Sequence, residues 1–257
     1  MQHNIDPIAF HLFGQAISWY WLFYPLAYIA IFYASIFYIQ QKKYAIARSD
    51  LIDFFTMLWI SLIVGGRLGY FLIYQSNLLI EQPSILLSLH LGGMSFHGAM
   101  LGVIVFLFIY QKVKKASAFT ILDIAILFSP IALFFGRLGN FINGELWGRP
   151  SDLPWAMVFP AADLITRHPS QLYQAITEGP ILLAILFVFK KDKVSMHNSL
   201  LFVATYSILR IITEYFREPD THLGFVFQYL TYGQILSLIT LLLSLYFLWR
   251  LPSAKYK

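Results

Sequence analysis

Residues 136–149, GRLGNFINGELWGR, end a long apolar run with two arginines, two asparagines, a glutamate and four glycines. A charge is costly in hydrocarbon, so Arg137, at the end of that run, is a candidate functional residue. Glycines let the backbone approach a bound molecule closely, and the forked donors of arginine suit a phosphate group. We therefore expect the other helices to hold this stretch against a lipid head group.

The composition is that of a membrane protein. Hydrophobic residues make up 58% of the 257 positions and charged residues only 12%, while the 18% of aromatic residues suits interfacial belts. The chain has no cysteine, which excludes disulfides, thiolate metal sites and a cysteine nucleophile of its own. The N-terminus has no basic region, so we expect no cleavable signal peptide.

Seven segments are long and apolar enough to span a bilayer as helices. They are predicted near residues 17–39, 52–75, 92–111, 120–141, 170–190, 198–217 and 232–250. A soluble helical protein would need polar faces that most of these segments lack. The predicted fold class is an all-α integral membrane protein with seven transmembrane helices, forming a single polytopic domain over residues 1–257.

Basic residues divide unequally between the two sides of the predicted bundle. On one side, the N-terminus, the connection between the second and third segments, the 142–169 loop and the connection between the sixth and seventh segments together hold only Arg149, Arg167 and Arg217. The other side holds twelve: Lys42, Lys43, Arg48, Lys112, Lys114, Lys115, Lys190, Lys191, Lys193, Arg250, Lys255 and Lys257. The positive-inside rule then predicts a periplasmic N-terminus, a cytoplasmic C-terminus and a periplasmic loop segment near 142–169. The net charge of +5 is explained by this placement, so we expect no nucleic-acid partner.

Four ionisable groups are predicted at one depth of the membrane. Arg67, Arg137 and Arg210 each lie in an outward-running segment, roughly 10 Å from its outer end. His97 lies near the start of the inward-running third segment, close to the same face. The alternative is that each arginine reaches the interface separately, and for Arg67 we expect a weaker, mainly structural role.

The sixth segment carries one polar stripe on an otherwise apolar helix. Tyr206, Arg210, Glu214 and Arg217 are spaced i, i+4, i+8 and i+11. Glu214 is placed to pair with Arg210 or Arg217. A salt bridge that locks the bundle is the structural interpretation. We expect both roles, with Glu214 orienting Arg210 and Arg210 facing a cavity.

The third segment opens with GGMSFHGAMLG at residues 92–102. Gly98 and Gly102 form a small-xxx-small face that favours close helix packing. His97 is either a general base, since histidine titrates near neutral pH, or a structural residue bonded to a neighbouring helix. At the start of the fifth segment, Ser170 is a plausible N-cap.

Several motifs resemble those of the bacterial phosphatidylglycerol–prolipoprotein diacylglyceryl transferase family. They are GMSFHG at 93–98, the opening stretch at 136–149, RHPSQLY at 167–173, Tyr206 with Arg210, EYFREPD at 214–220 and GQILS at 233–237. The resemblance follows nearly the whole chain in order. Two departures are Ala99, where the family often has a second glycine, and a loop after Pro160 that is shorter than in some members.

The resemblance implies a seven-helix enzyme of the bacterial inner membrane whose active site faces the periplasmic leaflet. It implies transfer of diacylglycerol from phosphatidylglycerol to the lipobox cysteine of a preprolipoprotein, with release of glycerol 1-phosphate. We assign catalysis to His97, Arg137 and Arg210, and expect no metal or cofactor. Substrate binding is assigned to Arg137, Asn140, Asn143, Glu145, Gly148, Tyr20, Tyr206 and Glu214.

The role of the polar side chains in the glycine-rich turn stays open. Asn140, Asn143 and Glu145 either bind the head group or brace the glycine-rich turn, and we favour Asn140 and Glu145 at the glycerol end. Rival functions are weaker. An anion transporter would need polar residues in the inner halves of the spans, an intramembrane protease would need a paired-aspartate or serine motif, and a structural scaffold leaves the depth-matched charges unexplained.

Overall fold

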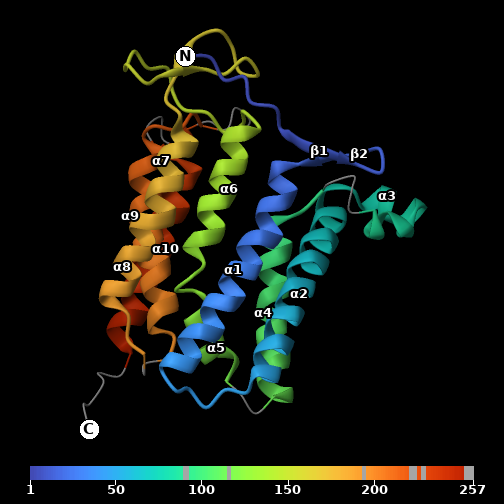
Figure 1. Cartoon of the computed structure of the whole chain (residues 1–257), viewed down its shortest axis with the longest axis vertical. Coiled ribbons are helices and arrows are strands. Elements are labelled where there is room, and N and C mark those ends of the chain that lie inside the picture. The colour runs from blue at the N-terminus through green and yellow to red at the C-terminus, as the bar shows by residue number, and fades with distance from the viewer. Residues whose placement is uncertain (89–92, 115–116, 193–194, 220–224, 227–229, 252–257) are drawn as a thin grey trace. The chain divides into compact units, whose positions relative to one another are not determined.

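A computed structural model describes residues 1–88, 93–114, 117–192, 195–219, 225–226 and 230–251. Helices dominate these residues, and the strands form small two-stranded ribbons (Figure 1). The chain divides into two compact units, one of Met1–Phe37 with Asp123–Lys257 and one of Tyr38–Leu122. The single polytopic domain stays a prediction. Of the basic residues used to predict topology, Lys115, Lys193, Lys255 and Lys257 lie outside the described residues.

Each predicted span overlaps a helix or a run of helices. These are α1 (Trp19–Gln41), α2 (Arg48–Tyr74), α4 (Phe96–Val113), α5 (Ala118–Ala125) with α6 (Pro130–Ile142), α7 (Ser170–Ile176) with η3 (Thr177–Ile181) and α8 (Leu182–Phe189), α9 (His197–Glu214) and α10 (Tyr232–Arg250). Among the described residues, four such stretches are long and apolar enough to cross a membrane, or five if the bent pair α5–α6 is one span. The chain is thus mostly helical with several spans, and their number of seven stays a prediction.

Two prolines shape the helices of the first unit. Pro130 begins α6 after a break at which α5 and α6 differ in direction by 52°. Pro180 lies inside η3, a π turn that joins α7 to α8. Because proline has no N–H and its ring crowds the preceding turn, a regular α-helix cannot continue through it, and the wider π turn accommodates it.

The helices α6 to α10 lie side by side in the first unit (Figure 1), where α6 packs on α7 and η3, and α9 packs on α8 and α10. Ser207 and Thr240 join α9 to α10 through a 2.9 Å hydrogen bond between their hydroxyls. At the start of α9, the buried Asp123 carboxylate accepts hydrogen bonds from the backbone N–H and the hydroxyl of Ser199. Polar bonds at its first turn and near its middle therefore anchor α9 to its neighbours.

A loop of residues 143–169 covers one end of α6 and α7, and the N-terminal segment joins it (Figure 1). The ribbon β3 (Met157–Val158) with β4 (Thr166–Arg167) lies in this loop, and His3 N–H donates to Val158 O at 2.9 Å. Phe159 is fully buried and stacks on the His3 ring. The other ribbons pair β1 (Ile8–Leu12) with β2 (Gln15–Ser18) and β5 (Phe225–Val226) with β6 (Leu230–Thr231).

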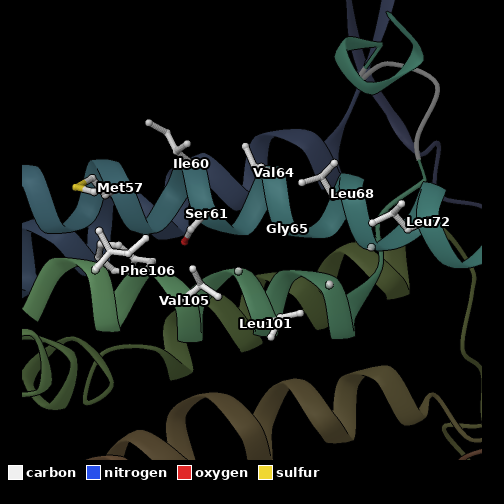
Figure 2. Close-up of a pocket in the computed structure, with 14 residues that line it drawn as sticks. Met57, Ile60, Ser61, Val64, Gly65, Leu68, Leu72, Leu101, Val105 and Phe106 are labelled. Atoms are coloured by element: carbon white, nitrogen blue, oxygen red, sulfur yellow. The ribbon is translucent and has the colours of Figure 1, made fainter. Parts of the chain in front are cut away.

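In the second unit, glycines allow α2 and α4 to touch backbone to backbone. A Cβ atom on Gly98 would lie 2.3 Å from Gly65 O, and one on Gly102 would lie 2.4 Å from Ser61 O. The predicted small-xxx-small contact is confirmed. The same helix pair borders an apolar groove with a volume of about 570 Å³, lined by side chains that include Leu68, Leu72 and Leu101 (Figure 2).

Arg67, in the second unit, holds the segment that follows α2. This segment contains α3 (Ser76–Glu81) and η1 (Pro83–Leu87). All three guanidinium nitrogens donate to backbone carbonyls, with Nη2 to Ile85 O at 2.5 Å, Nε to Leu86 O at 3.2 Å and Nη1 to Gly93 O at 3.1 Å. The side chain is 2% exposed and also lies over the Phe71 ring. Its contacts fit the mainly structural role expected for it.

Candidate active site

The first unit brings Arg137 of α6 against a carboxylate that the sequence analysis did not single out. Arg137 Nε donates to Glu178 Oε2 at 2.8 Å, and Nη2 lies 3.4 Å from Glu178 Oε1. The Glu178 side chain is fully buried. It belongs to the π turn η3, whose wider spacing sets it at α6, where a Cβ atom on Gly179 would lie 2.8 Å from Phe134 Cβ.

Arg210 of α9 points to the same carboxylate. Its Nη2 lies 2.8 Å from Glu214 Oε2, and its Nη1 lies 3.8 Å from Glu178 Oε1. The predicted pairing of Arg210 with Glu214 is confirmed. Glu214 in turn accepts a 3.1 Å hydrogen bond from the Thr231 hydroxyl. Arg210 Nη1 has no hydrogen-bond partner among the described residues, so it is a buried donor available to a ligand.

Tyrosines from two helices surround the two arginines. The Tyr206 hydroxyl of α9 is within hydrogen-bonding reach of the Arg137 guanidinium. Tyr20 of α1 lies on Gly139, where an added Cβ atom would be 2.3 Å from the Tyr20 ring, so only glycine permits this approach. The Tyr24 hydroxyl donates to the Tyr20 hydroxyl at 2.7 Å. Tyr20, Tyr24 and Tyr206 thus add hydroxyl groups from α1 and α9 to the part of the bundle that holds Arg137.

The glycine-rich turn after α6 is braced by its own side chains. Asn140 Nδ2 donates to Glu145 Oε1 at 2.8 Å, and Asn143 Nδ2 lies 3.4 Å from the same oxygen. Gly144 adopts a φ of +65°, a left-handed conformation that favours glycine. These bonds support the bracing role of the two asparagines, and Glu145 keeps a second carboxylate oxygen for another partner.

Gly148 packs against backbone on two sides. Its N–H donates to His168 O at 2.9 Å, and an added Cβ atom would lie 2.4 Å from that oxygen and 2.6 Å from Phe216 O. Gly148 therefore serves the packing of the loop against the end of α9. Its role in substrate binding stays a prediction.

Arg167 ties the same loop together outside the helices. It binds Asp163 through Nε at 3.1 Å and Nη2 at 2.5 Å, and its Nη1 donates to Gly148 O at 3.1 Å and Glu218 Oε2 at 3.2 Å. The hydrogen bond from Arg167 holds the pKa of Asp163 below its ordinary value. Burial lowers the pKa of the neighbouring His168, whose Nδ1 lies 3.2 Å from the Tyr173 hydroxyl. His168 therefore favours its neutral form, whose Nδ1 shares a hydrogen bond with that hydroxyl.

The side chain of His97 lies outside the described residues, although its backbone belongs to the first turn of α4. The choice between a general base and a structural histidine stays open. The N-terminus of that helix is capped by Ser95, whose Oγ accepts from Gly98 N at 3.2 Å. No group of three or more His, Cys, Asp or Glu side chains among the described residues is arranged to hold a metal ion.

Sequence reasoning missed Glu178 and made one error beside it. A carboxylate within an apolar span, directly before Gly179 and Pro180, was the available signal for Glu178. The prediction of Ser170 as an N-cap is wrong, because Pro169 occupies that position. The Ser170 hydroxyl instead donates to Leu146 O at 3.0 Å, which ties α7 to the glycine-rich turn.

The chain is similar to proteins of known activity over nearly its whole length. The sequence profile of the prolipoprotein diacylglyceryl transferase family matches residues 7–250. A phosphatidylglycerol–prolipoprotein diacylglyceryl transferase of Rickettsia bellii (strain OSU 85-389) is 46% identical over 248 residues, covering 95% of this chain and 94% of the relative. Proteins of the same name from Idiomarina loihiensis and Rickettsia typhi are each 42% identical, and cover 94% and 97% of this chain and 91% and 98% of their own lengths.

Proposed function

The chain belongs to the prolipoprotein diacylglyceryl transferase family, and we propose that it transfers the diacylglyceryl group of phosphatidylglycerol to the cysteine thiol of a preprolipoprotein lipobox. In this reaction a C–S thioether bond forms at the glyceryl carbon and the C–O bond to the phosphate breaks. The thiol proton goes to a base, and glycerol 1-phosphate leaves. This is the first step of bacterial lipoprotein maturation.

The observation that carries the proposal is a pair of arginines around one carboxylate, with Arg210 buried and Arg137 half-buried. A guanidinium has five N–H donors. Glu178 accepts from Nε and Nη2 of Arg137, and Arg210 Nη1 makes no hydrogen bond among the described residues. The remaining donors, Arg210 Nη1 among them, are available to two oxygens of a phosphate. Fixed cations there stabilise the charge that develops on the leaving phosphate, so they favour the transition state over the ground state.

The remaining site residues divide between the head group and the nucleophile. The asparagines bond Glu145 Oε1, and Glu145 Oε2 accepts hydrogen bonds from the hydroxyls of the head-group glycerol. Tyr20 and Tyr206 border the same head group. The acceptor thiol has a reference pKa near 8.5, so only roughly a few per cent is thiolate at neutral pH. His97 is proposed as the base that raises this fraction. The enzyme needs no cysteine, because the nucleophile arrives on the acceptor.

We place the enzyme in the bacterial inner membrane with seven spans, a periplasmic N-terminus and a cytoplasmic C-terminus. The unequal distribution of basic residues supports this orientation. Phosphatidylglycerol of the outer leaflet would then present its phosphate at the depth of Arg137 and Arg210. Proteins carrying a lipobox signal peptide would meet the same face as they leave the cytoplasm.

The test is transfer by the purified protein in vesicles that contain phosphatidylglycerol and a lipobox peptide. We expect the peptide to gain the mass of one diacylglyceryl group and an equal amount of glycerol 1-phosphate to appear. A peptide with serine in place of the cysteine is the matched control and should gain nothing. Glycerol phosphate released without lipidated peptide would identify a phospholipase instead, and passage of an anion without either product would identify a transporter.

A further inference from the structure

A buried glutamine of α7 has a side-chain amide without a hydrogen-bond partner among the described residues. Gln174 of α7 is fully buried, and neither its Nε2 nor its Oε1 has a hydrogen-bond partner among the described residues. A buried polar group without a partner costs about 1–3 kcal/mol, and a primary amide carries both a donor and an acceptor. Such a group in a native protein needs an explanation, and a ligand that the amide binds is one.

Gln174 lies between the two parts of the candidate site. Three residues earlier on the same helix, Gln171 Nε2 donates to Glu145 O at 2.6 Å. Four residues later, Glu178 accepts from Arg137. Residues three, four and seven apart share one face of a helix, and this face of α7 and η3 packs on α6. Gln174 therefore lies on the helix face that carries the contacts with Glu145 and Arg137.

The neighbours of Gln174 indicate which ligand would satisfy it. On one side, Arg137 and Arg210 suit a phosphate, whose oxygens accept hydrogen bonds. On the other side, the Glu145 carboxylate suits a hydroxyl, which donates one. An amide between them can donate from Nε2 toward the phosphate end and accept at Oε1 from a hydroxyl. A glycerol phosphate group presents acceptors and hydroxyls in this order, whereas a peptide backbone would leave the arginines without an anion.

We propose that Gln174 binds the glycerol phosphate head group of the donor lipid, with Nε2 donating to a phosphate oxygen and Oε1 accepting from a glycerol hydroxyl. The inference rests on the proposed transfer from phosphatidylglycerol and adds a residue that selects the head group. Selection follows because a donor lipid without head-group hydroxyls leaves Oε1 buried and unpaired. Loss of one such bond changes a rate by about tenfold.

The experiment compares two donor lipids in vesicles, phosphatidylglycerol and phosphatidylpropanol, which has the same phosphate but no head-group hydroxyl. The wild-type protein should transfer from phosphatidylglycerol about 10-fold faster or more. Gln174→Met keeps the length of the side chain and removes the amide but leaves Glu145 in place, so the ratio of the two rates should fall by about 10-fold from its wild-type value. Because an unpaired amide is replaced by an apolar group, this variant should melt at or above the wild-type temperature.

Thr177→Val is the matched control on the next turn. Among the described residues, the Thr177 hydroxyl donates to carbonyls of its own helical stretch, Tyr173 O at 2.9 Å and Gln174 O at 3.3 Å, so the wild-type ratio should persist. The proposal is overturned if Gln174→Met keeps the wild-type ratio of the two transfer rates, whether or not both rates fall. It is also overturned if the wild-type protein shows no preference between the two lipids. A raised KM for the acceptor peptide at an unchanged ratio would assign Gln174 to the peptide. A wild-type protein that uses neither lipid overturns the proposed function itself.

Discussion

Arg137 Nε and Glu178 Oε2 are joined by a 2.8 Å hydrogen bond within the helical bundle, and the carboxylate is fully buried. The other oxygen of Glu178 lies 3.8 Å from Arg210 Nη1, so one anion holds arginines from two helices. Without this carboxylate, the two neighbouring guanidinium groups would repel each other. Glu178 therefore sets the geometry into which a phosphate would bind, although no part of it need touch the substrate.

The first prediction concerns the fork of Arg137. Arg137→Lys keeps the charge but loses the planar pair of donors, so we expect transfer to fall about 100- to 1,000-fold, and Arg137→Ala should be no better. The measurement is diacylglyceryl transfer in membranes with matched amounts of protein. Arg67→Lys is the control. Its loss of backbone contacts should lower the melting temperature while transfer per folded molecule stays near wild type. A wild-type rate for Arg137→Lys would reduce Arg137 to a diffuse electrostatic attractor.

The second prediction concerns Glu178. Removing one partner of a buried ion pair leaves an uncompensated charge and costs about 3–5 kcal/mol, so Glu178→Gln should lower the melting temperature by about 10 °C. Added phosphatidylglycerol should raise the melting temperature of this variant more than that of the wild type, because its phosphate supplies the missing anion. Glu218→Gln removes a partly exposed partner of Arg167 and should change the melting temperature little. If both variants melt like the wild type, Glu178 does not hold the arginines.

Much of the fold follows from the sequence because hydrocarbon leaves few options. A membrane-spanning segment must satisfy its backbone hydrogen bonds internally, so a long apolar run predicts a helix. The predicted spans all overlap helices of the structure. The bend at Pro130 and the π turn at Pro180 were not predicted. Proline marks where a regular helix ends or distorts, but the form of the distortion depends on the neighbouring helices that pack there.

Site residues could be predicted where their type is rare within a membrane span. Residues that reach the site through contacts distant in the sequence were harder to predict. Arg137 and Arg210 stand out because arginine is costly within a span, and the structure directs both at one carboxylate. The hydrogen bond between Asn140 and Glu145 joins residues five positions apart. Bracing of the turn by these residues was one of the two roles considered for them, beside head-group binding. Glu178 and Gln174 reach the site from a helix that begins 33 residues after Arg137, with residues 143–169 between. No periodicity of the sequence reports such a contact.

The third prediction concerns pH and the loop ion pair. Because the bond to Arg167 lowers the pKa of Asp163 in the folded protein, this contact stabilises the fold above the ordinary carboxylate pKa of about 3.9. The stabilisation is lost as the pH falls through the lower, folded value. Asp163→Asn should therefore melt below the wild type at pH 7, and the difference should vanish in acid. Asp152→Asn, an exposed position of the same loop, should follow the wild type throughout. A difference independent of pH would show that charge is not involved.

The fourth prediction concerns orientation, and the absence of native cysteines makes it direct. Leu164→Cys places a thiol at an 85% exposed position of the 143–169 loop, and Lys112→Cys places one in the last turn of α4. In intact cells stripped of their outer membrane, a membrane-impermeant maleimide should label the first and not the second. Both should react once the inner membrane is opened. The reverse pattern would invert the topology and remove the argument that the site faces the outer leaflet.

The last prediction concerns the base. If His97 takes the thiol proton, His97→Asn should lose about 100- to 10,000-fold in transfer at pH 7. Because the acceptor thiol has a reference pKa near 8.5, each pH unit below this value changes the thiolate fraction about tenfold. The variant should therefore recover about tenfold in rate between pH 7 and pH 8, whereas the wild type should change less.

Ser95→Ala supplies the control for His97. It removes the cap at the start of the same helix, where Ser95 Oγ accepts from Gly98 N, and costs about 0.5–2 kcal/mol of stability without removing an ionisable group. We expect a lower melting temperature and a pH profile of wild-type shape. If His97→Asn also keeps that shape, with or without a fall in rate, the thiol proton goes elsewhere and His97 serves the packing of the helix.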